Sequence, residues 1–173
     1  SPENWRARLI KRLENETFLS AFHLVPDTMR DFLRIINTSH PKLITAYAGA
    51  IYELAQFAER QGIQVRPQNA IITSAGKLYP FMREKIEGVF QCRVYDRYGS
   101  REVGAIACEL PGLNGMWVPP WGNYIEVVDQ HGQDCPSGTE GNILVTCLNN
   151  YAMPFIRYEI GDRGVLEPDS ASS

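Results

Sequence analysis

The sequence has little net charge, few histidines and no long hydrophobic run. Its 173 residues carry a formal net charge of −3 without a basic stripe, which gives no electrostatic reason to expect a nucleic-acid partner. No apolar run approaches the roughly 18 residues of a membrane span, and the polar start is unlike a signal peptide. We therefore expect a protein that binds neither nucleic acid nor a membrane.

Paired cysteine motifs are missing as well. The four cysteines form no CxxC pair, and no histidine lies at a metal-ligand spacing from them. Separate thiols of this kind are typical of proteins in a reducing compartment, so we expect a cytoplasmic location. The four residues are Cys92, Cys108, Cys135 and Cys147.

What the sequence does have is the composition of a globular domain, with 44% hydrophobic and 21% charged residues. Before residue 95, helical periodicity alternates with short apolar runs. This pattern predicts helices after a cap at Asp27, from about Ala50 to Gln61 with a stop at Gly62, and from Pro80, and strands at 42–47, 70–73 and 92–95. Such alternation is the βαβ pattern of a parallel sheet.

After residue 104 the pattern changes to short strands without helices between them. We predict strands at 106–109, 116–118, 124–128, 142–147, 154–160 and 164–166, with turns at 111–112, 129–132 and 136–138. The predicted fold class is α/β, a parallel-sheet portion followed by a mixed or antiparallel β portion. We place the α/β part, with a helical start, at 1–104, the β-rich part at 105–168 and a frayed tail at 169–173.

Two predicted loops follow neighbouring strands of the parallel part, at 73–76 and 96–102. In parallel sheets, ligands favour the crevice beyond the carboxyl ends of the strands. The first loop is small and contains a glycine, so its backbone could lie against a flat heterocycle. The two loops are therefore the candidate ligand site.

The second loop, Tyr98-Gly99-Ser100-Arg101-Glu102, combines several kinds of chemistry. Tyr98 offers an aromatic face, Gly99 allows close approach, and Ser100 and Arg101 can donate to phosphate oxygens. Glu102 is a hard oxygen ligand of the kind that Mg²⁺ uses beside substrate phosphates. The same composition also suits an ordinary polar turn, so both interpretations stand at this point.

Four stretches in a fixed order favour the ligand-site interpretation. They are Thr73-Ser74-Ala75-Gly76-Lys77-Leu78-Tyr79-Pro80, Tyr98 to Glu102, Gly138-Thr139-Glu140-Gly141 with the strand after it, and Pro154 to Asp162. With them the sequence resembles the adenylate-forming superfamily of acyl- and aryl-CoA ligases. It is most similar to the phenylacetate–CoA ligase branch that includes capsule-biosynthesis adenylating proteins. The resemblance spans most of residues 40 to 168.

The resemblance implies a role for each matching residue. Tyr98 would pack on adenine, Asp96 would lie near the adenine amino group, and Asp162 would bind the ribose hydroxyls. Glu102 would hold Mg²⁺. The other side of the base would be lined by Ser74, Ala75 and Gly76, and Gly99 and Ser100 belong to the same nucleotide-binding motif as Tyr98.

The sequence also departs from the family pattern. Arg101 replaces the usual threonine, whose hydroxyl approaches the α-phosphate, and is our candidate catalytic residue. Its guanidinium could reach the same phosphate or turn to an acidic partner. Glu159 replaces a basic residue, and Asn142 a common glutamate.

A Ser/Thr/Gly-rich phosphate loop and a C-terminal domain with a catalytic lysine, both usual in the family, are absent from the sequence. We therefore expect a piece of the large N-terminal domain of a longer ligase, inactive alone, whose partners include the rest of that enzyme and could include a second copy in a homodimer. The parent would join a carboxylic acid, with an aryl acid among the candidates, to a thiol such as CoA, using ATP and Mg²⁺ and forming AMP. The alternatives are a nucleotide-binding module without catalysis and a structural or interaction domain.

Overall fold

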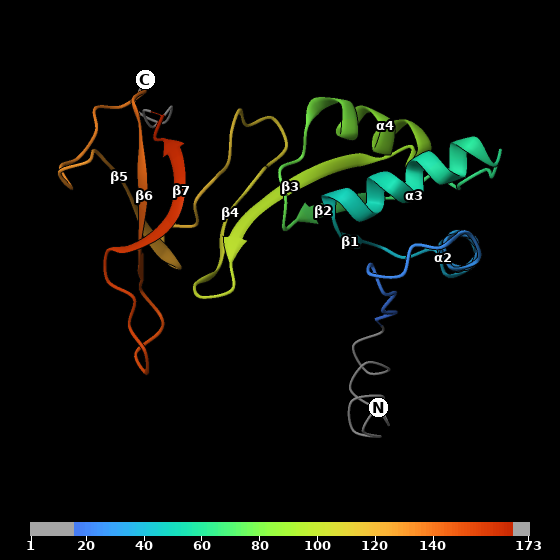
Figure 1. Cartoon of the computed structure of the whole chain (residues 1–173), viewed down its shortest axis with the longest axis horizontal. Helices are drawn as coiled ribbons and strands as arrows, with labels where there is room; N and C mark the ends of the chain where they lie inside the picture. The colour runs from blue at the N-terminus through green and yellow to red at the C-terminus, as the bar shows by residue number, and fades with distance from the viewer. Residues whose placement is uncertain (1–15, 168–173) are drawn as a thin grey trace.

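A computed structural model describes residues 16–167, in which a four-stranded sheet and a three-stranded sheet lie at opposite ends (Figure 1). The larger sheet has the order β1-β2-β3-β4, and β1, β2 and β3 are parallel, as predicted. Its strands are β1 (Ile44–Tyr47), β2 (Ala70–Ser74), β3 (Arg93–Ser100) and β4 (Gly104–Cys108). The helices are α2 (Pro26–Ser39), α3 (Ala48–Arg60) and α4 (Pro80–Phe90).

The first hydrophobic core lies between these helices and the parallel strands. The apolar side of α2 is buried, and it packs with α3 and α4 against the strands. Ile71 of β2, Phe90 of α4 and Val94 of β3 are at most 2% exposed. Burying side chains of this size contributes about 1.5–3 kcal/mol each, so this core stabilises the packing of the helices on β2 and β3.

The helix ends follow the sequence with one exception. Pro80 is the first residue of α4, and Gly62 follows α3 with φ +65°, both as predicted. The predicted cap at Asp27 is wrong, because Val25 is the N-cap of α2 and Pro26 its first residue. Without a side-chain cap there, Asp27 accepts a hydrogen bond of 2.9 Å from Arg30 one turn later.

β3 is longer than predicted, and the expected loop at 96–102 is mostly strand. β3 continues to Ser100 and pairs antiparallel with β4, so only residues 101–103 form a turn. The hairpin depends on Gly99, because a Cβ at this position would lie 2.2 Å from the carbonyl oxygen of Gly104. Apolar residues on β4, such as Ile106 at 1% exposure, bury the strand and favour this pairing over a loop.

The second sheet is antiparallel, one of the two arrangements predicted, with the order β5-β6-β7. Its strands are β5 (Asn123–Val128), β6 (Glu140–Cys147) and β7 (Tyr158–Val165). The predicted strand at 116–118 is reduced to a bridge between Trp117 and Cys108. The turns predicted at 111–112, 129–132 and 136–138 are closed by backbone hydrogen bonds within each turn.

β7 corrects another prediction. The strands expected at 154–160 and 164–166 are one strand that starts only at Tyr158, and Gly161-Asp162 lies inside it and not in a turn. The strand accommodates the pair because its register with β6 shifts between Asn142 and Leu144, and Gly161 takes φ +86°. Asp162 is thereby carried on a paired strand.

A second, smaller hydrophobic cluster joins β4 to the second sheet. Its buried members are Ile106, Ala107 and Val145, and Tyr98 and Ile160 pack against them half-buried. β3 runs from the helices toward β5–β7 (Figure 1), and its residue Tyr98 packs against this cluster. β4, which begins at Gly104, belongs to the sheet of the α/β part.

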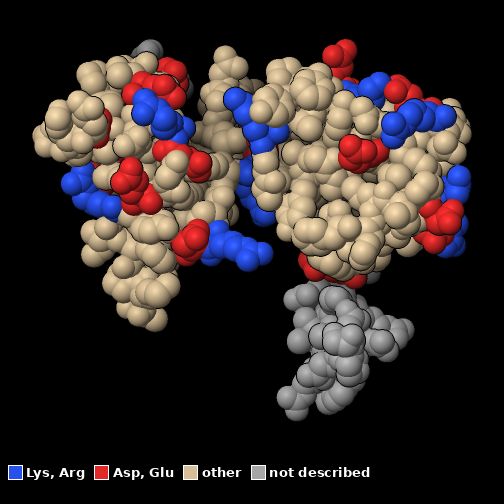
Figure 2. All heavy atoms as spheres, viewed as in Figure 1, with Lys and Arg blue, Asp and Glu red and all other residues tan. Residues whose placement is uncertain are grey.

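The surface carries mixed charges. On the face in Figure 2, positive and negative side chains are interspersed over both parts of the molecule. None of the helices in residues 16–167 combines the length and the apolar character that a membrane crossing requires. The helical start and frayed tail expected at the two ends fall largely at 1–15 and 168–173, outside the described residues.

Candidate nucleotide site

Tyr98 and Asp162, which the sequence places far apart, are in direct contact. The Tyr98 hydroxyl donates a hydrogen bond of 2.7 Å to Oδ2 of Asp162. Burial, this hydrogen bond and the negative charge of Asp162 raise the pKa of Tyr98 well above its usual value. Tyr98 therefore remains protonated and a donor at neutral pH, and β3 and β7 together present an aromatic ring beside an exposed carboxylate.

Asp96 precedes Tyr98 by two positions on β3, so both side chains lie on the same face of the strand. Its Oδ1 accepts a hydrogen bond of 2.9 Å from Oγ1 of Thr73, which is fully buried, and one of 3.1 Å from the backbone N–H of Arg97. The hydrogen bonds within residues 16–167 use only Oδ1 of this carboxylate. Oδ2 is thus left to accept a donor from a ligand.

The loop after β2 leaves the sheet beside Asp96, because Thr73 and Asp96 are paired in the parallel register. Ser74 ends β2, and Ala75 and Gly76 follow with φ +53° and +149°. The left-handed conformation of Ala75 is uncommon for a residue with a Cβ and costs about 1–2 kcal/mol. Ala75 and Gly76 are exposed while Leu78 is buried, so the loop is anchored at its end and open at its tip.

Glu102 lies in the turn between β3 and β4, where Ser100 fixes the backbone. The Ser100 hydroxyl oxygen accepts hydrogen bonds from the backbone N–H groups of Glu102 and Val103, at 3.2 and 3.3 Å. The Ser100 side chain, the N–H of Glu102 and the charge of Arg101 lower the pKa of the Glu102 carboxyl. This exposed carboxylate is therefore ionised at neutral pH.

Arg101, at the tip of the same turn, is exposed and has no hydrogen bond or ion pair with another residue in the described part of the chain. The sequence left two partners open for this guanidinium, a phosphate or an acidic side chain. Within residues 16–167 no acidic side chain forms an ion pair with it, and the charge that interacts with it is that of the neighbouring Glu102. Its guanidinium is available to an anionic ligand.

Glu102 could supply one carboxylate ligand to a metal ion but not a complete metal site. No group of three or more His, Cys, Asp or Glu side chains in residues 16–167 could hold a metal ion by itself. Mg²⁺ at nucleotide sites is usually bound through one or two carboxylates, substrate phosphates and water. The single exposed, ionised carboxylate of Glu102, next to the unpaired Arg101, is therefore consistent with a metal ion that arrives bound to a nucleotide.

A hollow of about 280 Å³ adjoins this turn, and sequence reasoning missed it. Glu102, Val103 and Ala105 of β4 line it together with residues around the start of β5 and the end of β6. Asn123, only 7% exposed, donates a hydrogen bond of 3.0 Å to the carbonyl oxygen of Ala105 and fixes one wall. The adjacent amides of Asn149 and Asn150 are the feature of the sequence that could have indicated a polar site. Nothing in the sequence places them near Glu102.

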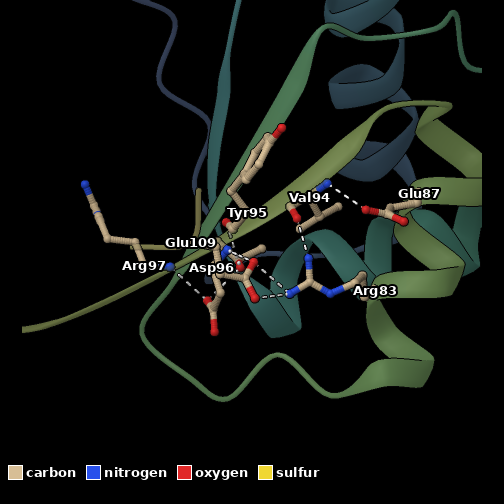
Figure 3. Close-up of polar contacts among 8 residues, drawn as sticks. Arg83, Glu87, Val94, Tyr95, Asp96, Arg97 and Glu109 are labelled. Atoms are coloured by element: carbon tan, nitrogen blue, oxygen red, sulfur yellow. Dashed lines mark hydrogen bonds and ion pairs between the residues drawn. The ribbon is translucent and has the colours of Figure 1, made fainter. Parts of the chain in front are cut away.

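Sequence reasoning also missed the polar network behind Asp96. Glu109 accepts a hydrogen bond of 2.8 Å from the backbone N–H of Asp96 and forms an ion pair with Arg83 of α4 (Figure 3).

Gly99, one of the predicted site residues, is required by the close approach of the β4 backbone, so its lack of a side chain has a structural reason independent of any ligand.

Relatives found by sequence point to one class of proteins, although no protein-family model matches the chain. Acyl-coenzyme A synthetase ACSM4, mitochondrial, of Rattus norvegicus is 26% identical over 83% of this chain and 28% of its own length. Protein CapK of Staphylococcus aureus is 26% identical over 88% of the chain and 33% of its length. Phenylacetate-coenzyme A ligase of Aromatoleum evansii is 28% identical over 82% and 33%. The chain thus spans about a third of the length of these curated relatives.

Solved structures show the same fold. A 2-hydroxyisobutyryl-CoA ligase in the postadenylation state, in complex with R3-HIB-AMP, superposes with a TM-score of 0.72 at 21% identity, over 83% of this chain and 32% of that one. A long-chain-fatty-acid-CoA ligase from Archaeoglobus fulgidus superposes with a TM-score of 0.65 at 14% identity, over 80% and 34%. By sequence the chain is similar to acyl-CoA synthetases, CapK and phenylacetate-CoA ligase, and its fold matches part of the N-terminal domain of adenylate-forming CoA ligases.

Proposed function

We propose that the chain is the adenosine-binding part of an ATP-dependent ligase that activates a carboxylic acid as an acyl adenylate and passes the acyl group to a thiol such as CoA. The observation that carries the proposal is the contact of 2.7 Å between Tyr98 and Asp162. A flat aromatic face and a carboxylate at this spacing suit a base and the ribose attached to it. The names of the relatives, which are CoA synthetases and ligases, support the reaction class.

In this proposal the described residues divide the nucleotide between them. The ring of Tyr98 packs on adenine, and the free Oδ2 of Asp96 accepts a hydrogen bond from its amino group. The Ser74–Gly76 loop lies against the other side of the base. Asp162 accepts hydrogen bonds from the two ribose hydroxyls, since an ionised carboxylate can accept from both arms of a cis-diol.

Glu102 and Arg101 act on the phosphates. Glu102 would hold Mg²⁺, which when bound neutralises charge on the phosphate oxygens. Arg101 stabilises the negative charge on the α-phosphate while the carboxylate attacks, because its guanidinium has no other partner in the described residues. Ser100 holds the turn in which both stand.

The remaining features of the proposal concern the whole protein. The parent would supply the phosphate-binding loop and the catalytic lysine from other segments, so the isolated chain would bind adenosine nucleotides without catalysing the reaction. We propose an aryl acid of the phenylacetate type as the substrate class, on the similarity to phenylacetate-coenzyme A ligase. The free state of all four cysteines supports a cytoplasmic location.

One observation favours a second candidate, a nucleotide-binding module without catalysis. Arg101 stands where the family resemblance implies a threonine, so the phosphate chemistry could have been lost while Tyr98, Asp96 and Asp162 were kept. A purely structural role explains the packing of Tyr98 on the second cluster. It does not explain the unused Oδ2 of Asp96 or the unpaired Arg101.

The test is ATP–pyrophosphate exchange by the full-length parent across a panel of aliphatic and aryl carboxylic acids. We expect exchange that depends on an added acid and falls by about tenfold or more in Glu102→Gln and in Arg101→Ala, with kcat affected more than KM. Arg101→Thr should keep more activity than Arg101→Ala. Glu84→Gln and Arg60→Ala, exposed charges elsewhere, are matched controls. A parent that binds ATP but shows no exchange with any acid would favour the second candidate.

A further inference from the structure

The edge of β3 next to Asp96 is completed by side chains. β4 pairs with β3 only from Arg97 onward. The backbone N–H and C=O groups of earlier β3 residues that point toward this edge therefore need other hydrogen-bond partners. The N–H of Val94 donates to Oε1 of Glu87 at 2.9 Å, and its carbonyl accepts from Arg83. Figure 3 shows these side chains reaching the strand from α4.

Glu109 is the residue at which this network meets Asp96. Its side chain accepts the N–H of Asp96 at 2.8 Å, and its own N–H donates to the Asp96 carbonyl at 2.9 Å. Arg83 donates from one nitrogen to both carboxylate oxygens of Glu109, at 2.7 and 2.8 Å. Because hydrogen bonds between charged groups are the stronger kind, α4 holds Glu109 and Glu109 holds both backbone groups of Asp96.

The side chain of Asp96 is fixed from the other direction. Its Oδ1 is held by the buried hydroxyl of Thr73 and by the backbone N–H of Arg97, and these two hydrogen bonds fix the plane of the carboxylate. Oδ2 is therefore presented in one orientation. A carboxylate oxygen favours an amino group and disfavours a carbonyl oxygen, so it can distinguish adenine from hypoxanthine, which carries a carbonyl at the same position.

We propose that Glu109, held by Arg83, is a positioning residue that fixes Asp96 for discrimination between adenine and 6-oxopurine nucleotides. This inference rests on the proposed function, because it assumes an adenosine nucleotide beside Asp96. Glu109 touches no part of the nucleotide and acts only through the backbone of Asp96. Its loss should therefore reduce the preference for AMP and leave the contribution of Tyr98 and Asp162 in place.

The chain offers a matched control for the ion pair. Lys85 of α4 donates to both carboxylate oxygens of Glu59 at 2.7 and 2.8 Å, the same lengths as in the Arg83–Glu109 pair. This pair links α4 to α3 and does not contact β3. Glu59→Gln therefore removes a comparable ion pair without disturbing Asp96.

The test compares the calorimetric affinities of AMP and IMP for the wild-type chain, Glu109→Gln, Arg83→Lys and Glu59→Gln. We expect the wild-type protein to prefer AMP, and the preference to fall by about threefold to tenfold in Glu109→Gln and Arg83→Lys, mainly through weaker AMP binding. Glu59→Gln should keep the wild-type ratio. Arg83→Lys retains the positive charge, so it carries the test if Glu109→Gln does not fold in a thermal unfolding measurement.

Each contrary result has a distinct meaning. An AMP to IMP ratio that is unchanged in both variants overturns the positioning role of Glu109 and leaves nucleotide binding intact. If the wild-type chain binds AMP and IMP equally, Asp96 does not recognise the amino group of adenine, and the inference is overturned. Absence of binding to either nucleotide overturns both this inference and the proposed function.

Discussion

The hydroxyl of Tyr98 and the carboxylate of Asp162 form a hydrogen bond of 2.7 Å across 64 positions of sequence. The contact joins β3, which extends the parallel sheet, to β7 of the antiparallel sheet. The contact forms because β3 continues beyond the parallel sheet into a hairpin with β4, and because a register shift keeps Gly161-Asp162 within β7. The candidate site is therefore a product of the two sheets together.

The ionisation of Tyr98 should depend on Asp162. Burial and the Asp162 carboxylate raise the pKa of Tyr98, so its phenolate should form only at a pH well above the usual value of about 10. Asp162→Ala removes the acceptor and the charge and should lower this pKa, while burial keeps part of the shift. The measurement is an NMR titration of tyrosine labelled at Cζ, with the Tyr98 signal assigned by Tyr98→Phe.

The sign for stability follows from the same shift. The folded-state pKa of Tyr98 lies above the unfolded value, so its contribution to stability is fully present below about pH 10 and is lost as the pH rises through the folded pKa. Asp134→Ala, an exposed carboxylate of the second part, serves as the control. Identical Tyr98 titrations in wild-type protein and Asp162→Ala would show that the contact does not exist in solution.

Replacing Gly99 by alanine should destabilise the hairpin of β3 and β4. The added Cβ would lie 2.2 Å from the carbonyl oxygen of Gly104 and 3.1 Å from Cα of Ala105, both of them backbone atoms that cannot move alone. Overpacking of this kind costs about 1–3 kcal/mol. We expect a lower urea midpoint with an unchanged slope.

Gly88→Ala is the matched control for this substitution. A Cβ at Gly88 meets no atom within 4 Å, and alanine in the last turn of α4 should stabilise the helix by up to about 1 kcal/mol. The two substitutions should thus shift the midpoint in opposite directions. Equal shifts would mean that β4 does not approach β3 as closely as described.

Cys92 should be an unreactive thiol in the folded protein. Burial and the nearby charge of Glu87 raise its pKa to about 11, so roughly 0.1% is thiolate at pH 8. Alkylation by iodoacetamide, followed by mass spectrometry of the Cys92 peptide, should be slower by more than about a hundredfold in the folded than in the urea-unfolded protein.

Glu87→Gln should accelerate the alkylation of Cys92 modestly, since burial is the larger cause of the raised pKa. Glu84→Gln, on the exposed side of the same helix, should leave the rate unchanged. If folded and unfolded protein react at the same rate, the described burial of Cys92 is incorrect.

The parallel part of the fold could be predicted because its signals are local. Periodic apolar residues gave α2 and α3, and Pro80 and Gly62 marked helix ends at residues whose backbone preferences leave few alternatives. Asp27 was misjudged because proline at the first position of α2 replaced a side-chain cap. Sequence rules for helix ends are reliable only where a single capping or helix-terminating residue is present.

The hairpin of β3 and the bulge in β7 could not be predicted because tertiary contacts decide them. Tyr98-Gly99-Ser100 has the composition of a loop, and only β4 makes it a strand. Gly161-Asp162 has the composition of a turn, and only the pairing of β7 with β6 on both sides of it, with a register shift between, keeps it inside a strand. The residues of the site were found through the resemblance, whereas Glu109 and Asn123 carry no signal in the sequence that links them to it.

Binding of AMP to the isolated chain tests the central claim most directly. Isothermal titration calorimetry should show weak but measurable binding by the wild-type protein, loss of that binding in Asp162→Ala, and unchanged binding in the control Asp134→Ala. Tyr98→Phe should retain most of the affinity, because it keeps the ring and frees the carboxylate. Equal heats of AMP binding in wild-type protein and Asp162→Ala would contradict the assignment of this surface as an adenosine site.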